Sequence, residues 1–155
     1  MKQIFKKVAI MCVLALVLCF GACEPVGNSG EEVKEISVSL TVSYTGYEKT
    51  FDATGEFATV EDVMQFLAQG EEFTFTASEG DYGSFITEVC GYAVSGNEFW
   101  GIYTDTITND SNGLPNVFEE YTTTVGGKTY YSCAQGVSGQ KVYNGENVLL
   151  IVGSF

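Results

Sequence analysis

The sequence predicts an α+β domain in which a mixed sheet packs against one main helix. Residues 36–44, ISVSLTVSY, alternate strictly between apolar side chains and Ser or Thr, which is the pattern of a half-buried strand. Residues 60–69 carry apolar side chains at helical spacing. The run VLLIV at 148–152 is apolar on both faces, which is typical of a strand in the middle of a sheet. These three segments define the fold class.

The first strand is expected to form a hairpin, because Gly46 provides a turn before the returning segment KTFDATGEF. Thr59 is the expected N-cap of the helix that follows, with Asp62 three residues later and Gly70 at the C-terminal stop. The apolar stripe of this helix has the spacing i, i+3, i+4, i+7 and consists of Val60, Val63, Met64 and Leu67.

Further strands are predicted after the helix, separated by Gly and Asn turns. The segment FTFTA alternates, and four more strand-like segments follow it: SFITEVC, EFWGIYTD, KTYYSC and NVLLIVGSF. A hairpin, one helix and then strands that end in a central one is the order of a β-grasp fold. We therefore expect a β-grasp-like domain over residues 35–155.

The N-terminal residues 1–22 have the features of an export signal. Three lysines precede the apolar run VAIMCVLALVLCFGAC, which is short for a membrane span. The run ends in FGAC, which resembles the lipobox of bacterial lipoproteins, although Phe20 replaces the usual Leu or Val. This predicts lipidation of Cys23, a flexible tether at 23–34 and an extracytoplasmic domain anchored to the bacterial cell membrane. Ordinary secretion and an uncleaved N-terminal anchor are the alternatives.

The charge balance argues against one class of partner. All 20 acidic residues follow Cys23, where only four lysines oppose them, so the net charge of that part is 4 − 20 = −16. The chain contains no arginine. A nucleic acid is therefore not an expected partner, and the acidic residues are interpreted as a solvated outer surface.

Only Cys90 and Cys133 belong to the predicted domain, because Cys12 and Cys19 lie in the signal and Cys23 takes the lipid. Outside the reducing cytoplasm, two cysteines on strand-like segments predict one disulfide. The chain has no histidine and no CxxC motif, so a zinc site lacks ligands. No metal and no cofactor are expected.

The segment TNDSNGLPNVFE partly matches a calcium-binding loop. Positions 3, 5, 6, 9 and 12 of such a loop are occupied by Asp110, Asn112, Gly113, Asn116 and Glu119. Position 1, however, is Thr108 where an Asp is needed, and the preceding segment is strand-like. A polar surface loop is therefore the expectation, with a calcium site as the alternative.

Four segments together resemble the transcobalamin-like C-terminal domain, a family of small extracytoplasmic β-grasp modules: TVEDVMQFL, GSFITEVCGY, EFWGIYTD and GVSGQKVYNGENVLLIV. The resemblance covers residues 36–155, and an insertion at 106–127 departs from it. Its features are a strand end from Ile86 to Gly91 with one extra residue, Trp100 with Tyr103, and Gly145-Glu146 in place of Gly-Asp.

The family resemblance implies a role in recognition. In the family's vitamin carriers, this domain closes over a corrinoid that is held against a second, helical domain. No such second domain is expected in this chain, so the resemblance implies recognition of a ligand or partner in general. Cobalamin binding by this chain alone does not follow from it.

The aromatic stretch CGYAVSGNEFWGIY is the candidate recognition site. On a strand, Trp100 and Ile102 share one face while Phe99 and Tyr103 share the other, and Ile102 favours the Trp100 face as the core face. Gly101 predicts that a ligand or another loop approaches the backbone closely. Core packing is the alternative for all these rings. The predicted ligand-binding residues are Tyr92, Phe99, Tyr103 and Tyr131.

The combined prediction is a surface-anchored bacterial lipoprotein that binds a small molecule, such as a corrinoid or a glycan, without catalysis. Catalysis is not expected because the chain has no histidine or arginine, and no nucleophile and base can be paired. The alternative function is a cell-surface adhesion or assembly module that binds another protein through a sheet edge or the loop at 106–127.

Overall fold

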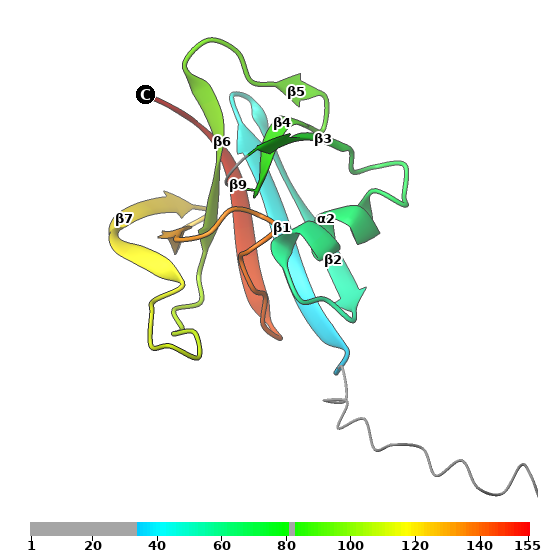
Figure 1. Ribbon diagram of the computed structural model, residues 1–155. Helices are drawn as coiled ribbons and strands as arrows, with labels where there is room; N and C mark the ends of the chain where they lie inside the picture. Colours follow the sequence, from blue (N-terminus) through cyan, green and yellow to red (C-terminus); the bar gives the residue numbers. More distant parts are fainter. Residues whose placement is uncertain (1–33, 81–82) are drawn as a thin grey trace, which may run out of the picture. The chain divides into compact units, whose positions relative to one another are not determined.

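The computed structural model describes residues 34–80 and 83–155 (Figure 1). The predicted signal peptide, Cys23 and most of the predicted tether lie outside the described residues. Within these ranges, no helix has the length and hydropathy needed to span a membrane. The elements are β1 (Ile36–Tyr44), β2 (Tyr47–Gly55), α2 (Val60–Leu67), β3 (Phe75–Gly80), β4 (Gly83–Val89), β5 (Tyr92–Ala93), β6 (Glu98–Thr104), β7 (Val117–Val125), β8 (Lys128–Cys133) and β9 (Glu146–Ser154).

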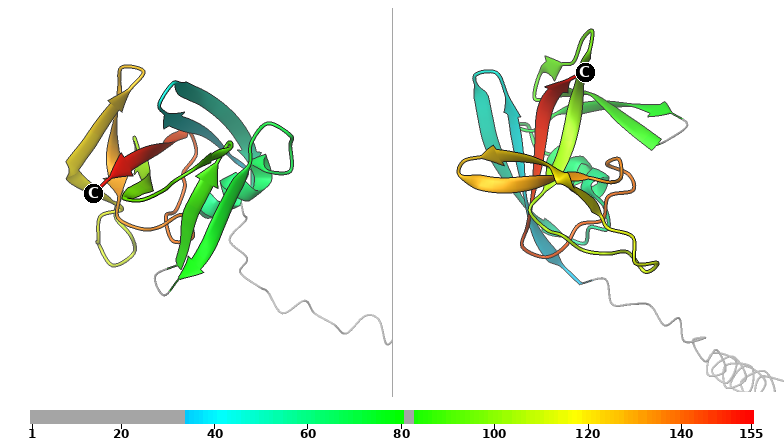
Figure 2. Two further views of the ribbon diagram at one scale, coloured as in Figure 1. Left: turned by 90° about the horizontal axis from the view of Figure 1, so that it is seen from above. Right: turned by 90° about the vertical axis from the view of Figure 1, so that its left-hand side faces the viewer.

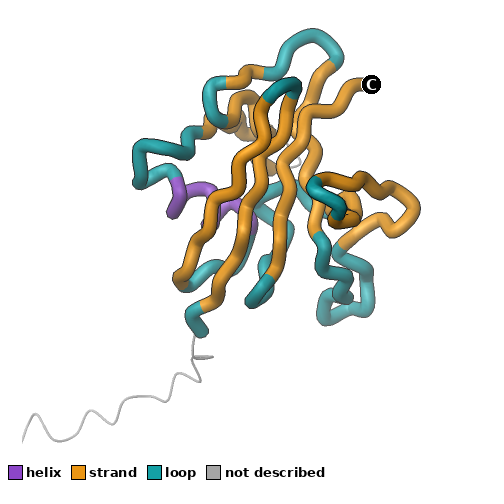
Figure 3. The backbone as a smooth tube through the Cα atoms, turned by 180° about the vertical axis from the view of Figure 1, so that it is seen from behind, coloured by secondary structure: helices purple, strands orange, loops and turns teal. Residues whose placement is uncertain are grey.

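Six strands form a mixed sheet in the order β2-β1-β9-β6-β8-β7 (Figure 3). The neighbours β1 and β9 run parallel, and the other neighbouring pairs in this sheet are antiparallel. The apolar run of β9 thus lies inside the sheet as predicted: Val148, Leu149 and Leu150 are at most 1% exposed. The coarse fold class, a mixed sheet with one main helix in the described residues, is confirmed.

A second layer covers one face of the six-stranded sheet. It consists of α2 and of a separate three-stranded sheet in the order β3-β4-β5, which Figures 1 and 2 show beside the larger sheet. The alternation predicted for β1 is confirmed, since Val38, Leu40 and Val42 are buried in the core between the layers. On the opposite face, the Ser39 hydroxyl donates a hydrogen bond of 2.6 Å to Asp52 of β2.

The helix begins at the predicted N-cap. The Thr59 hydroxyl accepts a hydrogen bond from the Asp62 backbone N–H at 3.3 Å, and the Asp62 carboxylate accepts one from the Thr59 N–H at 2.8 Å. This reciprocal capping box satisfies donors that the helix leaves unpaired. Hydrogen bonds from Thr59 and Ala58 lower the pKa of Asp62, although burial opposes them. The helix ends at Leu67, two residues before the predicted end, because Ala68 caps it.

The predicted disulfide is not present in this structure, because Cys90 and Cys133 are both free among the described residues. The Cys90 carbonyl accepts a hydrogen bond from the Tyr44 hydroxyl, at the C-terminal end of β1. Burial and the nearby Glu146 raise the pKa of the Cys133 thiol. Since Glu146 pairs with Val38 near the start of β1, the two cysteines lie near opposite ends of that strand. Six residues of strand span about 20 Å, whereas a disulfide requires Cα atoms within about 7 Å.

The insertion at 106–127 forms a strand as well as the predicted polar loop, because its second half is β7, which pairs with β8. In the loop, one Asp110 carboxylate oxygen accepts hydrogen bonds from the backbone N–H groups of Asn112 and Leu114, both at 2.8 Å. These bonds lower the pKa of Asp110. The aspartate therefore organises the turn of its own loop.

Candidate functional site

Two strand edges of the domain are left partly unpaired. β6 pairs with β8 only through its last two residues, so residues 98–102 have no strand partner on that side among the described residues. β5 pairs with β4 only at Glu88 and Val89, which leaves residues 83–86 without a strand partner on the β5 side within the described part. Unpaired strand edges offer backbone donors and acceptors to a ligand or partner.

A pocket of about 720 Å³ lies between β4 and β6. This volume falls within the range of about 300–1,000 Å³ that is typical of small-molecule sites. None of the lining side chains carries a charge, and most of them are apolar. The pocket is lined by Ser84, Phe85 and Ile86 of β4, by Phe99, Trp100 and Ile102 of β6, by the segment Ala134, Gln135 and Gly136, and by Phe155.

Trp100 joins the pocket to the core. Its side chain is 7% exposed, and its ring makes edge contacts with Tyr44 and Tyr92, with ring centroids 6.1 Å apart in both pairs. This confirms the prediction that the Trp100 face of β6 is the core face. The Trp100 Nε1 atom is buried and has no hydrogen-bond partner among the described residues. Buried polar groups are normally hydrogen-bonded, so this donor needs an explanation.

Phe99 forms the opposite wall of the pocket, on the other face of β6. Its ring packs against Phe155 with centroids 4.7 Å apart. Gly153 makes room for the Phe99 ring, because a Cβ at this position would lie 2.7 Å from that ring. Gly101 makes room for the Tyr103 ring in the same way, because a Cβ there would lie 2.9 Å from it. The close approach predicted at Gly101 is therefore present, but aromatic rings of the same strand produce it. The pocket wraps around the open edge of β6.

The four predicted ligand-binding residues do not line one pocket, and only Phe99 borders the space between β4 and β6. Tyr92 stacks on Tyr44 with centroids 4.7 Å apart, and its hydroxyl donates a hydrogen bond of 3.0 Å to Glu98. That hydrogen bond raises the pKa of Tyr92. Tyr103 and Tyr131 are half-buried around the junction of β6 and β8. Their role in binding stays a prediction.

Several pocket residues were not predicted from the sequence. Phe85 lies within the segment GSFITEVCGY and is 53% exposed, while its neighbour Ile86 is 8% exposed. An exposed aromatic ring on a strand indicates a binding surface only when the strand register, and therefore the face of the ring, is known. Gln135 and Phe155 reach the pocket from segments that are distant in sequence, and nothing in their local pattern indicated this.

Two perturbed carboxyl groups lie away from this pocket and stabilise the start of β9. Burial raises the pKa of Glu146, which is 1% exposed and accepts hydrogen bonds from the Thr104 hydroxyl and the Tyr143 backbone N–H. Asp105 accepts hydrogen bonds from Asn147 and Lys128, which lower its pKa although burial opposes them. Because each oxygen of Glu146 is held by a structural donor, we interpret this pair as part of the fold.

Comparisons with known proteins show the fold at a coarse level. No family model matches the chain, and no curated protein matches it. Among solved structures, haptocorrin in complex with Cbi superposes with a TM-score of 0.57 and 19% sequence identity, covering 79% of this chain and 26% of haptocorrin. This chain therefore spans about a quarter of the length of haptocorrin.

A second solved structure has nearly the same length as the matched region. It comes from Ruminococcus gnavus ATCC 29149 and is provisionally described as a metal binding protein. It superposes with a TM-score of 0.52 and 16% identity, covering 79% of this chain and 98% of the other. Within the described residues, no group of three or more Cys, Asp or Glu side chains is placed to hold a metal ion. Haptocorrin is thus described in complex with a ligand, and the second neighbour is described by a binding role.

Proposed function

We propose that this chain is a lipid-anchored, extracytoplasmic bacterial module of the transcobalamin-like type that binds a small molecule without converting it. Its binding site is the pocket between β4 and β6. The proposal includes a β-grasp arrangement of the domain, in which the first hairpin and α2 precede a final strand that runs parallel to β1. Lipidation at Cys23 is the proposed membrane anchor.

The observation that supports this function best is the pocket itself. It combines a volume of about 720 Å³ with walls from both sheets, and its apolar side chains surround two open strand edges. Apolar walls with a few polar groups are the usual composition of small-molecule sites. The polar side chains of the lining are Ser84 and Gln135, and the lining residue Trp100 has a buried N–H without a partner among the described residues.

The chemistry of the walls favours a neutral ligand with an extended apolar face. The lining side chains offer no cation for an anionic group, and the whole chain has a net charge of −13. A corrinoid or a glycan meets this description, and the structural similarity to haptocorrin supports the corrinoid. Since this chain matches 26% of haptocorrin, we expect a corrinoid to contact this pocket on one side only.

Binding is testable through the single tryptophan of the chain, because Trp100 lines the pocket. Cobinamide and a panel of neutral oligosaccharides are titrated into the purified chain while tryptophan emission is recorded. We expect one of these ligand classes to change the emission saturably. Phe85→Ala should weaken that binding about 5- to 150-fold, which corresponds to about 1–3 kcal/mol for an aromatic contact.

The matched control is Phe118→Ala on β7. Phe118 is 46% exposed and Phe85 is 53% exposed, but only Phe85 lines the pocket. We expect Phe118→Ala to leave the affinity unchanged. Equal losses in both variants, or an emission spectrum that no ligand class alters, would contradict the proposed site.

A protein partner is the second candidate function, and the open edges of β4 and β6 favour it specifically. An extended peptide segment can add to such an edge through backbone hydrogen bonds, with its side chains in the apolar pocket. Hydrogen exchange separates the two functions. A peptide strand should protect backbone amides along residues 98–102, whereas a small molecule should protect few of them.

A further inference from the structure

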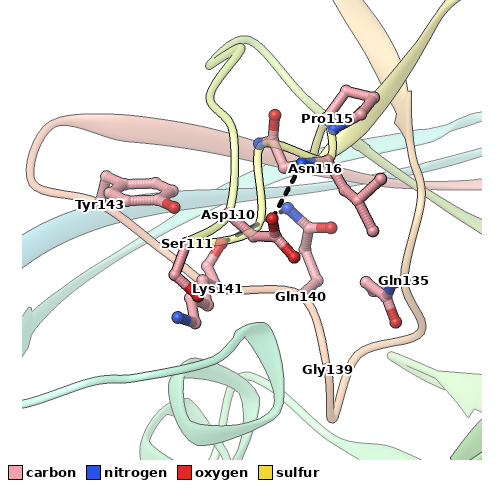
Figure 4. Close-up of a pocket in the computed structure, with 10 residues that line it drawn as sticks. Asp110, Ser111, Pro115, Asn116, Gln135, Gly139, Gln140, Lys141 and Tyr143 are labelled. Carbon is pink, nitrogen blue, oxygen red and sulfur yellow. Dashed lines mark hydrogen bonds between the residues drawn. The ribbon is translucent and has the colours of Figure 1, made fainter.

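A second, smaller pocket has a different chemical character. Its volume is about 200 Å³, and it lies between the loop at 110–116 and the segment at 135–143 (Figure 4). In Figure 4 the Gln140 side chain reaches toward Asp110, with Ser111 and Lys141 on one side and Gln135 on the other. Gln135 also borders the larger pocket, but Trp100 and the phenylalanines do not reach this one.

The loop wall of this small pocket is held in place by its own hydrogen bonds. The Asp110 backbone N–H donates to the Leu114 carbonyl at 2.8 Å, in addition to the two bonds that the Asp110 carboxylate accepts. The Asn116 side chain accepts from the Thr108 N–H at 2.6 Å and donates to the Thr106 carbonyl at 2.9 Å. A wall that is fixed in advance reduces the entropy lost when a ligand binds.

The other wall is anchored to the start of helix α2. The Gln140 carbonyl accepts a hydrogen bond from the Val60 N–H at 2.9 Å, and the Val137 carbonyl accepts one from the Glu61 N–H at 3.0 Å. The Gln140 backbone N–H donates to the Gly136 carbonyl at 2.8 Å. This short segment therefore holds the Gln140 side chain in a defined position.

Within the described part of the chain, Gln140 has a buried acceptor without a donor. Its side chain is 1% exposed, and its Oε1 atom has no hydrogen-bond partner among the described residues. Its Nε2 donates only a long bond of 3.4 Å to the Lys141 carbonyl. A buried amide oxygen without a donor costs about 1–3 kcal/mol, so a donor from a ligand or an ordered water would stabilise it.

Opposite charges also meet at this pocket. Asp110 uses one carboxylate oxygen for its loop, and no bond within the described residues engages the other oxygen. Lys141 lines the same pocket and makes no ion pair within 4.0 Å among the described residues. The site thus offers two acceptors, one of them anionic, together with one cationic donor.

We propose that this pocket binds a small zwitterion of the α-amino acid type. Its ammonium group donates hydrogen bonds to Asp110 and to Gln140 Oε1, and its carboxylate faces Lys141. One ammonium satisfies both acceptors because it has three donors. A volume of about 200 Å³ is that of about seven water molecules, which is enough for a small amino acid.

The test uses the purified full-length chain labelled with ¹⁵N. Glycine, serine and glutamine are titrated separately, and the amide signals of Gly139, Gln140 and Lys141 are followed. We expect saturable shifts of these signals and an unchanged Trp100 emission, because Trp100 does not line this pocket. Removing either charge of the probe should abolish the shifts, so N-acetylglycine and glycinamide are the matched probes.

Two variants locate the site. Asp110→Asn keeps an oxygen for the loop N–H groups but removes the charge, and Gln140→Met keeps the size of the side chain but removes its acceptor. Each should weaken binding at least tenfold, whereas Glu119→Gln, outside the pocket, should not weaken it.

Several results would overturn the proposal. They are the absence of shifts with all three amino acids, equal shifts with N-acetylglycine, and shifts produced instead by a neutral sugar such as glucose. The probe series decides the question even if a variant does not fold. A failure here is distinct from a failure of the larger pocket, which the tryptophan emission reports.

Discussion

Trp100→Ala is the substitution that best separates the scaffold from the surface of β6. A buried tryptophan removes about 150–250 Å² from water, which corresponds to a transfer free energy of about 4–6 kcal/mol. Trp100 is 7% exposed and contacts two tyrosine rings, but the pocket on one side allows water to fill part of the space. We therefore expect a loss near the lower end of the range for such truncations, about 3 kcal/mol of unfolding free energy.

Trp100→Phe should cost much less. Phenylalanine keeps an aromatic ring in the core, and it removes the Nε1 donor that has no partner among the described residues. Loss of an unsatisfied polar group offsets part of the packing loss, so we expect a cost of about 1 kcal/mol. Tyr103→Ala, on the half-buried opposite face, should cost about 1–2 kcal/mol.

Urea unfolding followed by far-ultraviolet circular dichroism measures these differences without relying on tryptophan fluorescence. With a slope of about 2 kcal/mol/M, Trp100→Ala should lower the midpoint by about 1.5 M and Trp100→Phe by about 0.5 M. A larger loss for Tyr103→Ala than for Trp100→Ala would show that the two faces of β6 are assigned the wrong way round.

Two other predictions concern pH and anchoring. Burial raises the pKa of Glu146 in the folded state above its ordinary 4.5. The stability that this group contributes is therefore fully present below pH 4.5, and it is lost as the pH rises through the raised pKa of the folded state. In Glu146→Gln the amide oxygen accepts from the Tyr143 N–H and the amide N–H donates to the Thr104 hydroxyl, so both contacts are kept with the second one reversed in direction. The stability of this variant relative to the unsubstituted chain should increase from pH 4.5 to pH 8, and a decrease in thermal-unfolding measurements would contradict this. Cys23→Ser should abolish labelling by a fatty-acid analogue and release the chain from the membrane fraction, and surviving label would exclude Cys23 as the lipidation site.

Local sequence patterns determined the elements that one segment specifies by itself. The alternation in β1, the capping pair Thr59 and Asp62, and the apolar run of β9 each depend on neighbours within a few residues. Residue alternation together with Ile102 was also enough to place Trp100 in the core. Such patterns reflect backbone geometry, which repeats every two residues in a strand and every 3.6 in a helix.

Only the tertiary structure decided which of these residues border a pocket. The predicted set Tyr92, Phe99, Tyr103 and Tyr131 disperses, because β5, β6 and β8 direct these rings to different surfaces. The number of cysteines and the predicted extracytoplasmic location suggested a disulfide. The sheet register, however, places Cys90 and Cys133 near opposite ends of β1. Pocket walls come from strand edges that stay unpaired, and pairing between distant segments is a property of the whole fold, which no local pattern encodes.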